Sequence, residues 1–113
     1  PYLAASISIE DKASLPRIDE LKAFKGTKIL VLEPLLEGLS LRGKLKGLSW
    51  VILGSETGTG ARPLNHDWAR RIRDEVKSAG IPFFIKQLGT SHKVQDRELD
   101  CVTWSEFPVG FVK

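Results

Sequence analysis

The sequence predicts an α/β domain of about four parallel strands with flanking helices. Three short apolar runs, residues 29–32, 50–53 and 82–85, each give way to polar or flexible residues. Continuous apolar runs of this kind are typical of strands that are covered on both faces, as in parallel sheets. An amphipathic stretch, residues 65–80, separates the last two runs, and strands that alternate with helices favour right-handed βα units.

The first part of the chain predicts one strand and one helix. Residues 2–9 alternate loosely between apolar and small polar side chains, which predicts a strand, and residues 11–14 predict a turn. Pro16 suits the first turn of a helix because its missing N–H costs nothing there, and Gly26 is expected to close that helix. The buried face of this helix is expected to carry Leu15, Ile18, Leu21 and Phe24.

The middle of the chain predicts two further strands. Residues 28–32 form the second strand, which Pro34 ends because proline cannot continue the hydrogen-bonded ladder. Residues 35–48 show no clear period and predict irregular structure with at most one short helical turn. Residues 50–53 form the third strand.

The second helix is the best-defined element of the sequence. Asn65 is a suitable N-cap and Gly80 a suitable C-cap, with Pro82 just beyond. Three- and four-residue spacing places Trp68, Ile72, Val76 and Ala79 on the core side. The opposite side is expected to be a solvated face of Arg70, Arg71, Arg73 and Lys77.

The rest of the chain predicts a last strand and a cover. Residues 82–85 form the fourth strand, with Phe83, Phe84 and Ile85 buried. Residues 89–113 are expected to be a polar loop and then a terminal cover that packs Val102, Trp104 and Phe107 against the domain. Residues 1–113 therefore predict a single α/β domain.

The composition excludes several classes of protein. The chain has 113 residues and a net charge of +3. Because Cys101 is its one cysteine, it can form neither an internal disulfide nor a cysteine-rich metal site. It has no apolar run long enough to span a membrane and no visible signal peptide, so we expect a cytoplasmic protein without membrane contact. The slight basicity fits either a solvated surface or a nucleic-acid-facing patch. The start at Pro1 and the lack of methionine suggest a processed product or a fragment of a longer protein.

The glycine-rich loop over residues 54–63 is a candidate binding loop, although it is neither a P-loop nor a dinucleotide fingerprint. It lacks the lysine and hydroxyl residue that a P-loop needs, and its glycine spacing differs from that of a dinucleotide site. Its glycines can expose backbone N–H groups, and Arg62 can bind an anion through two hydrogen bonds. The alternative is a tight structural loop in which Arg62 pairs with Glu56.

Polar residues follow each predicted strand, and the carboxyl ends of parallel strands are where such folds bind ligands. Converging carboxylates can hold a metal or ribose hydroxyls, or act as acid and base, but they can also simply pair with nearby cations. The two histidines are expected to be surface or capping residues, so no zinc site is assembled. The candidate ligand-binding residues are Glu10, Asp11, Glu33, Gly54, Ser55, Glu56, Gly58, Gly60, Arg62, Lys86 and Gln87.

A family resemblance covers nearly the whole chain. The ordered segments that carry it are residues 6–11, 17–21, 32–36, 50–63, 67–68, 80–87, 97–100 and 103–108. The most specific are Glu33-Pro34-Leu35-Leu36 and the run from Gly54 to Pro63. Together these segments resemble the C-terminal half of a phage-associated family of unknown function. Its full-length members carry an N-terminal three-cysteine cluster of the radical-SAM type on a partial TIM barrel.

The resemblance implies a half TIM-barrel-like sheet without the half that holds the iron–sulfur cluster. An iron–sulfur cluster and S-adenosylmethionine are conceivable only together with that missing half. In that case the resemblance implies that four residues of this chain would border the S-adenosylmethionine: Glu10, Glu33, Glu56 and Arg62. The family usually has glycine in place of Ser55 and Cys101. Because a half barrel leaves open sheet edges, we expect a homo-oligomer.

Three functions are compatible with these patterns. The first is a domain that binds an anion or nucleotide at the strand ends and is not catalytic as this isolated chain. The second is a phage-derived structural or interaction module that is not an enzyme. The third is a small hydrolase or nucleotide-modifying enzyme that uses the acidic residues with a divalent metal.

Overall fold

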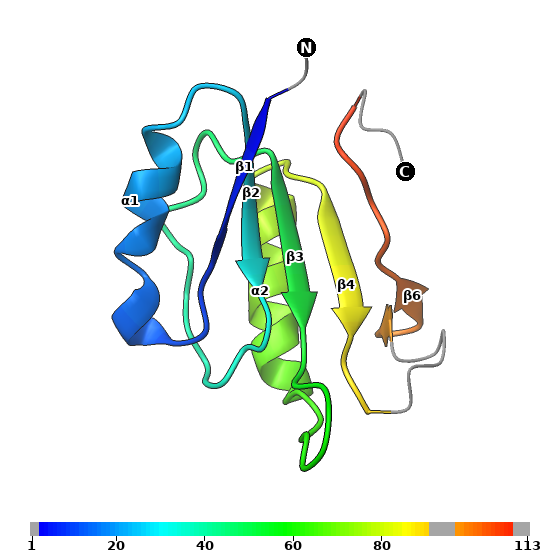
Figure 1. Cartoon of the computed structure of the whole chain (residues 1–113). Helices are drawn as coiled ribbons and strands as arrows, with labels where there is room; N and C mark the ends of the chain where they lie inside the picture. The colour runs from blue at the N-terminus through cyan, green and yellow to red at the C-terminus, as the bar shows by residue number, and fades with distance from the viewer. Residues whose placement is uncertain (1–2, 91–96, 110–113) are drawn as a thin grey trace.

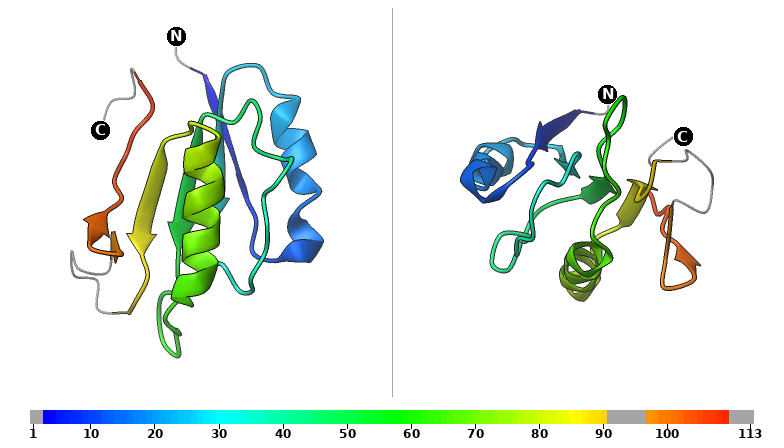
Figure 2. Two further views of the ribbon diagram at one scale, coloured as in Figure 1. Left: turned by 180° about the vertical axis from the view of Figure 1, so that it is seen from behind. Right: turned by 90° about the horizontal axis from the view of Figure 1, so that it is seen from below.

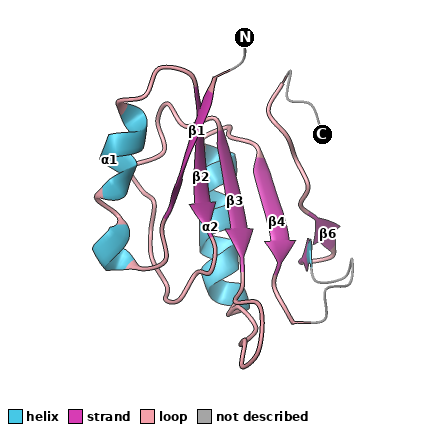
Figure 3. Ribbon diagram, in the orientation of Figure 1, coloured by secondary structure: helices cyan, strands magenta, loops and turns pink. Residues whose placement is uncertain are grey.

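A computed structural model of the chain describes residues 3–90 and 97–109, and it has a single four-stranded parallel sheet. The strands are β1 (Ala4–Ser8), β2 (Thr27–Leu32), β3 (Trp50–Gly54) and β4 (Phe83–Gln87), in the order β1-β2-β3-β4 (Figure 1). The helices are α1 (Arg17–Lys22) and α2 (His66–Ser78), with a 3₁₀ turn, η1 (Lys12–Ser14), before α1. A short antiparallel pair, β5 (Glu98–Leu99) and β6 (Val102–Thr103), follows β4 (Figure 3). The predicted α/β class with four parallel strands is confirmed.

The strand order explains why the covering elements lie on one side of the sheet. Each crossover moves the chain by one strand in the same direction, and right-handed crossovers then place every connection on the same face. In Figure 2, seen from below, α1, α2 and the connection over residues 35–48 lie on one side of the curved sheet. The sheet of the described residues is open and does not close into a barrel.

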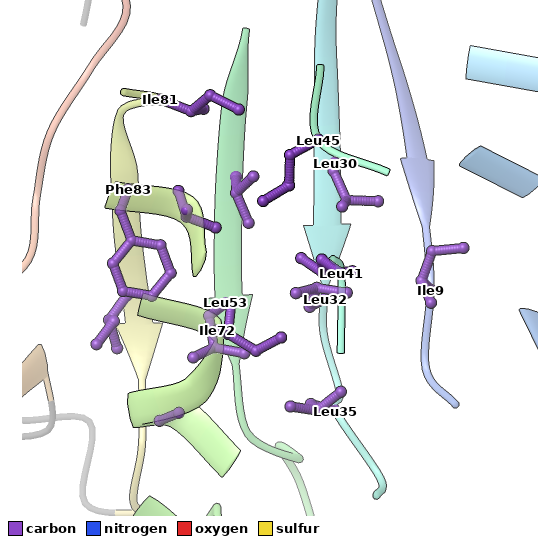
Figure 4. Packing of buried hydrophobic residues seen from close by; sticks show 14 of the residues in the cluster. Ile9, Leu30, Leu32, Leu35, Leu41, Leu45, Leu53, Ile72, Ile81 and Phe83 are labelled. Atoms are coloured by element: carbon purple, nitrogen blue, oxygen red, sulfur yellow. The ribbon is translucent and has the colours of Figure 1, made fainter. Parts of the chain in front are cut away.

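The core lies between the sheet and these covering elements. Alternate strand residues point toward it, among them Leu30, Leu32 and Leu53, which are fully buried (Figure 4). The helix α2 contributes Ile72, and the 35–48 connection contributes a series of buried leucines: Leu35, Leu39, Leu41, Leu45 and Leu48. The connection is therefore irregular, as the sequence predicts, and its leucines anchor it in the core.

The C-terminal segment covers the outer edge of β4. The Ile85 N–H donates to the Trp104 carbonyl at 2.8 Å, and the Glu106 N–H donates to the Phe83 carbonyl at 3.1 Å. Behind this edge, the Phe107 ring lies 5.2 Å from the Trp50 ring, centroid to centroid. Trp104 and Phe107 of the C-terminal segment therefore pack against the sheet.

Several details of the elements differ from the prediction. Val102, expected in the cover, is 47% exposed, because it lies in the short β5–β6 hairpin rather than along β4. Helix α1 ends at Lys22 with Ala23 as its C-cap, so Gly26 lies in the turn beyond it, with φ +145°. The predicted apolar face of α1 ends with Leu21. Phe24, which was expected to belong to that face, lies beyond the end of the helix and is half-buried.

The amphipathic face of α2 is shifted from the predicted one. Ala69, Ile72 and Val76 are buried, whereas Ala79 is exposed at the C-cap. Alanine carries too little apolar surface to tell the two sides of a helix apart in sequence. The predicted N-cap is confirmed, since the Asn65 side chain accepts the N–H groups of Asp67 and Trp68. The predicted C-cap is wrong by one residue, because Ala79 is the C-cap and Gly80 follows it with a left-handed φ of +73°.

Candidate functional site

A hydrogen-bonded network joins the carboxyl ends of β2, β3 and β4. The Gln87 amide nitrogen donates to the Glu33 carboxylate at 2.9 Å and to the Ser55 carbonyl at 2.7 Å. The Lys86 ammonium lies 3.3 Å from the other Glu33 oxygen. Because the arrowheads of all four strands point to the same end of the sheet, residues far apart in sequence meet here (Figure 1). The structure thus brings Glu33, Ser55, Lys86 and Gln87 together, as the sequence predicts.

Gly54 lies inside this network because a side chain would not fit. A Cβ at this position would lie 2.8 Å from the Gln87 amide nitrogen and 3.0 Å from a Glu33 carboxylate oxygen. The register between β3 and β4 shifts at this point, so that Gly54 lies opposite Gln87 rather than Lys86. The shift turns the buried Gln87 side chain, 5% exposed, toward Glu33.

Ser55 connects the network to a pocket of about 370 Å³. The Ser55 N–H donates to the Gln87 carbonyl at 2.9 Å, and its hydroxyl donates to the Gly89 carbonyl at 3.0 Å. The pocket lies beside the first turn of α2, where Trp68 forms part of its wall. Its lining residues are Leu35, Leu36, Ser55, Glu56, Arg62, Pro63, Leu64, Asn65 and Trp68.

An ion pair lies at the rim of this pocket. The Arg62 Nε lies 2.5 Å from a Glu56 carboxylate oxygen, and the Arg62 side chain is 72% exposed. An exposed pair of this kind contributes only about 0–1 kcal/mol, so its guanidinium can exchange a carboxylate partner for another anion. Arg62 therefore pairs with Glu56, as in the structural alternative, and also lies at the rim of the pocket.

The Asp11 and Glu10 side chains are not among the residues that line this pocket, and no hydrogen bond found among the described residues joins them to the network. The Asp11 carboxylate caps η1, accepting the Ser14 hydroxyl at 2.7 Å and the Ser14 N–H at 3.0 Å. These two bonds, with the hydroxyl first, lower the pKa of Asp11. Glu10 uses its backbone carbonyl, which accepts the Leu36 N–H at 2.9 Å. Four acidic side chains at strand ends are thus not one carboxylate cluster.

The two remaining glycines of the candidate set shape the loop rather than line the pocket. Gly58 and Gly60 have φ angles of +91° and +78°, and the Ala61 N–H donates to the Gly58 carbonyl at 3.1 Å. Glycine adopts this left-handed region without the penalty that a Cβ brings. The turn returns the chain so that Arg62 comes back beside Glu56.

Sequence reasoning missed the apolar part of the pocket. Leu35, Leu36 and Leu64 were not in the candidate set, and Trp68 was assigned to the core by its helical spacing. The position of Leu35 and Leu36 directly after the second strand was the available signal, since only polar residues at strand ends were selected.

The described residues offer no ready metal centre. Within residues 3–90 and 97–109, no three His, Cys, Asp or Glu side chains gather closely enough to share an ion. His66 is exposed at the first position of α2, and His92 lies outside the described residues. Cys101 is an exposed free thiol in the β5–β6 turn.

The basic side of α2 is not the solvated face that the sequence predicts. The carboxylate of Asp100, in the β5–β6 turn, accepts Arg73 at 2.5 Å and Arg70 at 3.0 Å, and only 17% of the Arg73 side chain is exposed. Hydrogen bonds from Arg73 and then Arg70 lower the pKa of Asp100, and Asp100 in turn raises the pKa of both guanidinium groups. These pairs dock the hairpin onto the helix. Arg71 alone of the three arginines stays exposed without an ion pair among the described residues.

Comparison with known families identifies the chain. The model of a family described as a protein of unknown function, DUF5131, matches residues 2–108. The chain belongs to the DUF5131 family. No curated protein and no solved structure matches it.

The DUF5131 match spans the sheet, the strand-end network and most of the C-terminal segment, so all three lie within the region that the family model covers. Among the described residues of this DUF5131 chain, no helix is long and apolar enough to cross a membrane.

Proposed function

We propose that this domain binds a nucleotide-like ligand in the pocket at the carboxyl end of β3. We further propose that it does so as part of a radical-SAM-like partial barrel in a phage-associated protein. The observation that carries the proposal is the composition of the pocket: an apolar wall that includes Trp68, with Glu56 and Arg62 at the rim. Pockets for small ligands are mostly apolar with a few placed polar groups.

Each part of a nucleotide has a matching group. The Trp68 indole and the neighbouring leucines offer apolar surface to a base, and Glu56 can accept the hydroxyls of a ribose. Arg62 can bind a phosphate or carboxylate through two hydrogen bonds. The first turn of α2 begins beside the same pocket, and its positive end favours an anion there.

The residues of this chain do not fit an iron–sulfur cluster. A cluster of the radical-SAM type needs several thiolates, and the sequence holds one cysteine, Cys101. The proposal therefore assigns the cluster to a three-cysteine half outside this sequence, and we derive no reaction step through it. S-adenosylmethionine is the member of the nucleotide class that such a half would add, with Glu33, Glu56 and Arg62 at its border.

Ligand-dependent thermal stabilisation tests the proposal. We expect AMP, ADP or S-adenosylmethionine at millimolar concentration to raise the melting temperature of the domain. Arg62→Gln should weaken this effect, whereas Arg71→Gln, which removes an exposed arginine outside the pocket lining, should leave it intact. If none of the three ligands shifts the melting temperature, or if both variants respond equally, the pocket is not a nucleotide site.

A second candidate is an interaction module that self-associates. The edge of β4 is covered by the chain itself, whereas among the described residues β1 pairs with β2 alone, and it carries no charge or proline that would discourage further pairing. We propose that a second copy pairs there and makes the homo-oligomer predicted from the open sheet. Sedimentation of a clean monomer at high concentration would exclude it.

A further inference from the structure

The amino-terminal end of the sheet carries a basic surface whose cations form no ion pair within residues 3–90 and 97–109. Two segments reach it, residues 22–28 from the end of α1 into the start of β2 and residues 39–49 before β3, and they lie side by side (Figures 1 and 2). They join where the Lys28 N–H donates to the Ser49 hydroxyl at 3.0 Å and the Ser49 N–H donates to the Lys28 carbonyl at 2.8 Å. We call the cations of these two segments the amino-end basic surface: Lys22, Lys25, Lys28, Arg42, Lys44 and Lys46.

The charge is concentrated there. Neither segment contains an acidic residue, so they hold six positive charges in a chain whose net charge is +3. The remainder of the chain is therefore net negative. A patch of positive charge on a domain that is otherwise slightly negative is the electrostatic pattern expected of a surface that binds a polyanion.

The cations of this surface also differ in their pairing. Every ion pair found among the described residues uses a cation from elsewhere: Arg62, Arg70, Arg73, Lys77 or Lys86. In the amino-end basic surface the Lys28 ammonium donates to the Gly26 carbonyl at 3.2 Å, and no carboxylate of the described residues lies within ion-pair distance of the six. Their charges remain available to a partner.

Two consecutive turns present part of this surface. The Lys44 N–H donates to the Leu41 carbonyl at 2.9 Å, and the Leu48 N–H donates to the Leu45 carbonyl at 3.0 Å. Each turn has glycine at its third position with positive φ, +79° at Gly43 and +90° at Gly47, as a type II turn requires. The second position of each turn, its exposed corner, is a cation: Arg42 in the first and Lys46 in the second.

The turns are fixed from below. Leu41, Leu45 and Leu48 are buried in the core. The Glu75 carboxylate of α2 accepts the Leu41 N–H at 2.8 Å and also bonds the Ser40 hydroxyl. The apolar side chains thus point inward and the cations outward, from a backbone whose position is set before any partner binds.

A hollow of about 910 Å³ lies between these turns and the last part of α2. Arg42 and Lys46 line one side, and Ser78 lines the other. The acidic neighbours Asp74 and Glu75 are already engaged, the first with Arg73 at 2.9 Å and the second with the base of the turns.

From these observations we infer that the amino-end basic surface binds the sugar–phosphate backbone of nucleic acid. The cations are spread over two segments, which suits a chain of phosphates better than one small anion. An anionic membrane is disfavoured because the leucines between the cations are buried and leave no apolar side chains to enter lipid. Contacts to phosphates carry no base specificity, so binding should be independent of sequence.

Fluorescence anisotropy with a labelled DNA duplex of about 20 base pairs and a single-stranded RNA of about 20 nucleotides tests the inference. We expect a Kd of about 1–100 µM near physiological salt, rising steeply as salt is added. Arg42→Gln/Lys46→Gln should raise the Kd by about tenfold or more at 0.1 M salt and flatten the slope of log Kd against log salt by up to about 2.

The matched control is Lys12→Gln/Arg71→Gln, which removes one lysine and one arginine that are equally exposed but lie outside both segments. This control should stay within about twofold of the unsubstituted chain in Kd, since its cations are outside the surface. Equal weakening by both double variants would overturn the inference, because binding would then follow net charge alone. Absence of salt-dependent binding up to about 100 µM, or binding to phosphatidylserine vesicles without binding to either nucleic acid, would also overturn it.

Discussion

Replacing Gly54 with alanine should disrupt the network that joins β2, β3 and β4. The new Cβ would lie 2.8 Å from the Gln87 amide nitrogen and 3.0 Å from Glu33 carboxylate and methylene atoms. The Gln87 side chain is buried and holds two hydrogen bonds, so it cannot move aside without giving up at least one. We expect Gln87 to give up its hydrogen bond to Glu33, because the Glu33 side chain is partly exposed and can turn to solvent.

The magnitude follows from the bond that is lost. A hydrogen bond to a charged group contributes about 1.5–3 kcal/mol to stability. Alanine in place of glycine returns about 0.4–1 kcal/mol by reducing the conformational entropy of the unfolded chain. We therefore expect Gly54→Ala to lower the free energy of unfolding by about 1–2 kcal/mol, or the melting temperature by roughly 4–8 °C for a domain of this size.

Urea unfolding of a double-mutant cycle tests the cause. Gln87→Ala removes the amide that the new Cβ would meet, so Gly54→Ala should cost less than half as much in that background. The coupling between the two substitutions would then be about 1 kcal/mol. Additive costs, with no coupling, would refute the steric argument and place the effect in the β3 backbone.

Two further changes test other parts of the fold. Cys101→Gly should raise the free energy of unfolding by about 1 kcal/mol in urea melts, because Cys101 has a φ of +65° in a two-residue hairpin turn, while Cys101→Ser should bring no gain. The pKa of Glu106 is lowered, since hydrogen bonds from Lys77 and the Phe83 N–H outweigh the raising effect of its burial. The stability that the ionised Glu106 contributes is therefore complete above its pKa in the unfolded chain, about 4.5. This contribution is lost as the pH falls from there through the lower pKa of Glu106 in the folded protein. Glu106→Gln should make thermal stability less dependent on pH in this acid range, and an unchanged profile would contradict the assignment.

The strands and the second helix were predictable because their signals are local. The two central strands carry continuous apolar runs, and the predicted strands 28–32 and 50–53 end within one residue of β2 and β3. Asn65 and Gly80 mark the ends of α2 because capping chemistry needs particular residues at particular positions. Helix α1 was overextended because an apolar spacing of three residues persists beyond the last helical turn.

The candidate site was only partly predictable because its contacts are distant in sequence. Glu33 and Gln87 are both visible as polar residues after strands, and the parallel topology brings them together. The pairing of Arg73 with Asp100 depends on how the β5–β6 hairpin docks on α2, and no periodicity encodes that docking. The sequence also did not show that Asp11 would be separate from the other strand-end carboxylates. Its side chain is used locally as the cap of the 3₁₀ turn η1.

The two proposals concern opposite ends of one sheet, and this separation makes their tests independent. A strand of five residues, such as β3, is about 17 Å long. Exposed charges screen one another over about 8 Å at physiological salt, so Arg42 at one end adds little to the potential at Arg62 at the other. Loss of nucleotide binding in Arg62→Gln with polynucleotide binding intact, and the reverse for Arg42→Gln/Lys46→Gln, would assign the two ligands to separate ends. If either variant impaired both, one continuous anion-binding surface would have to replace the two sites.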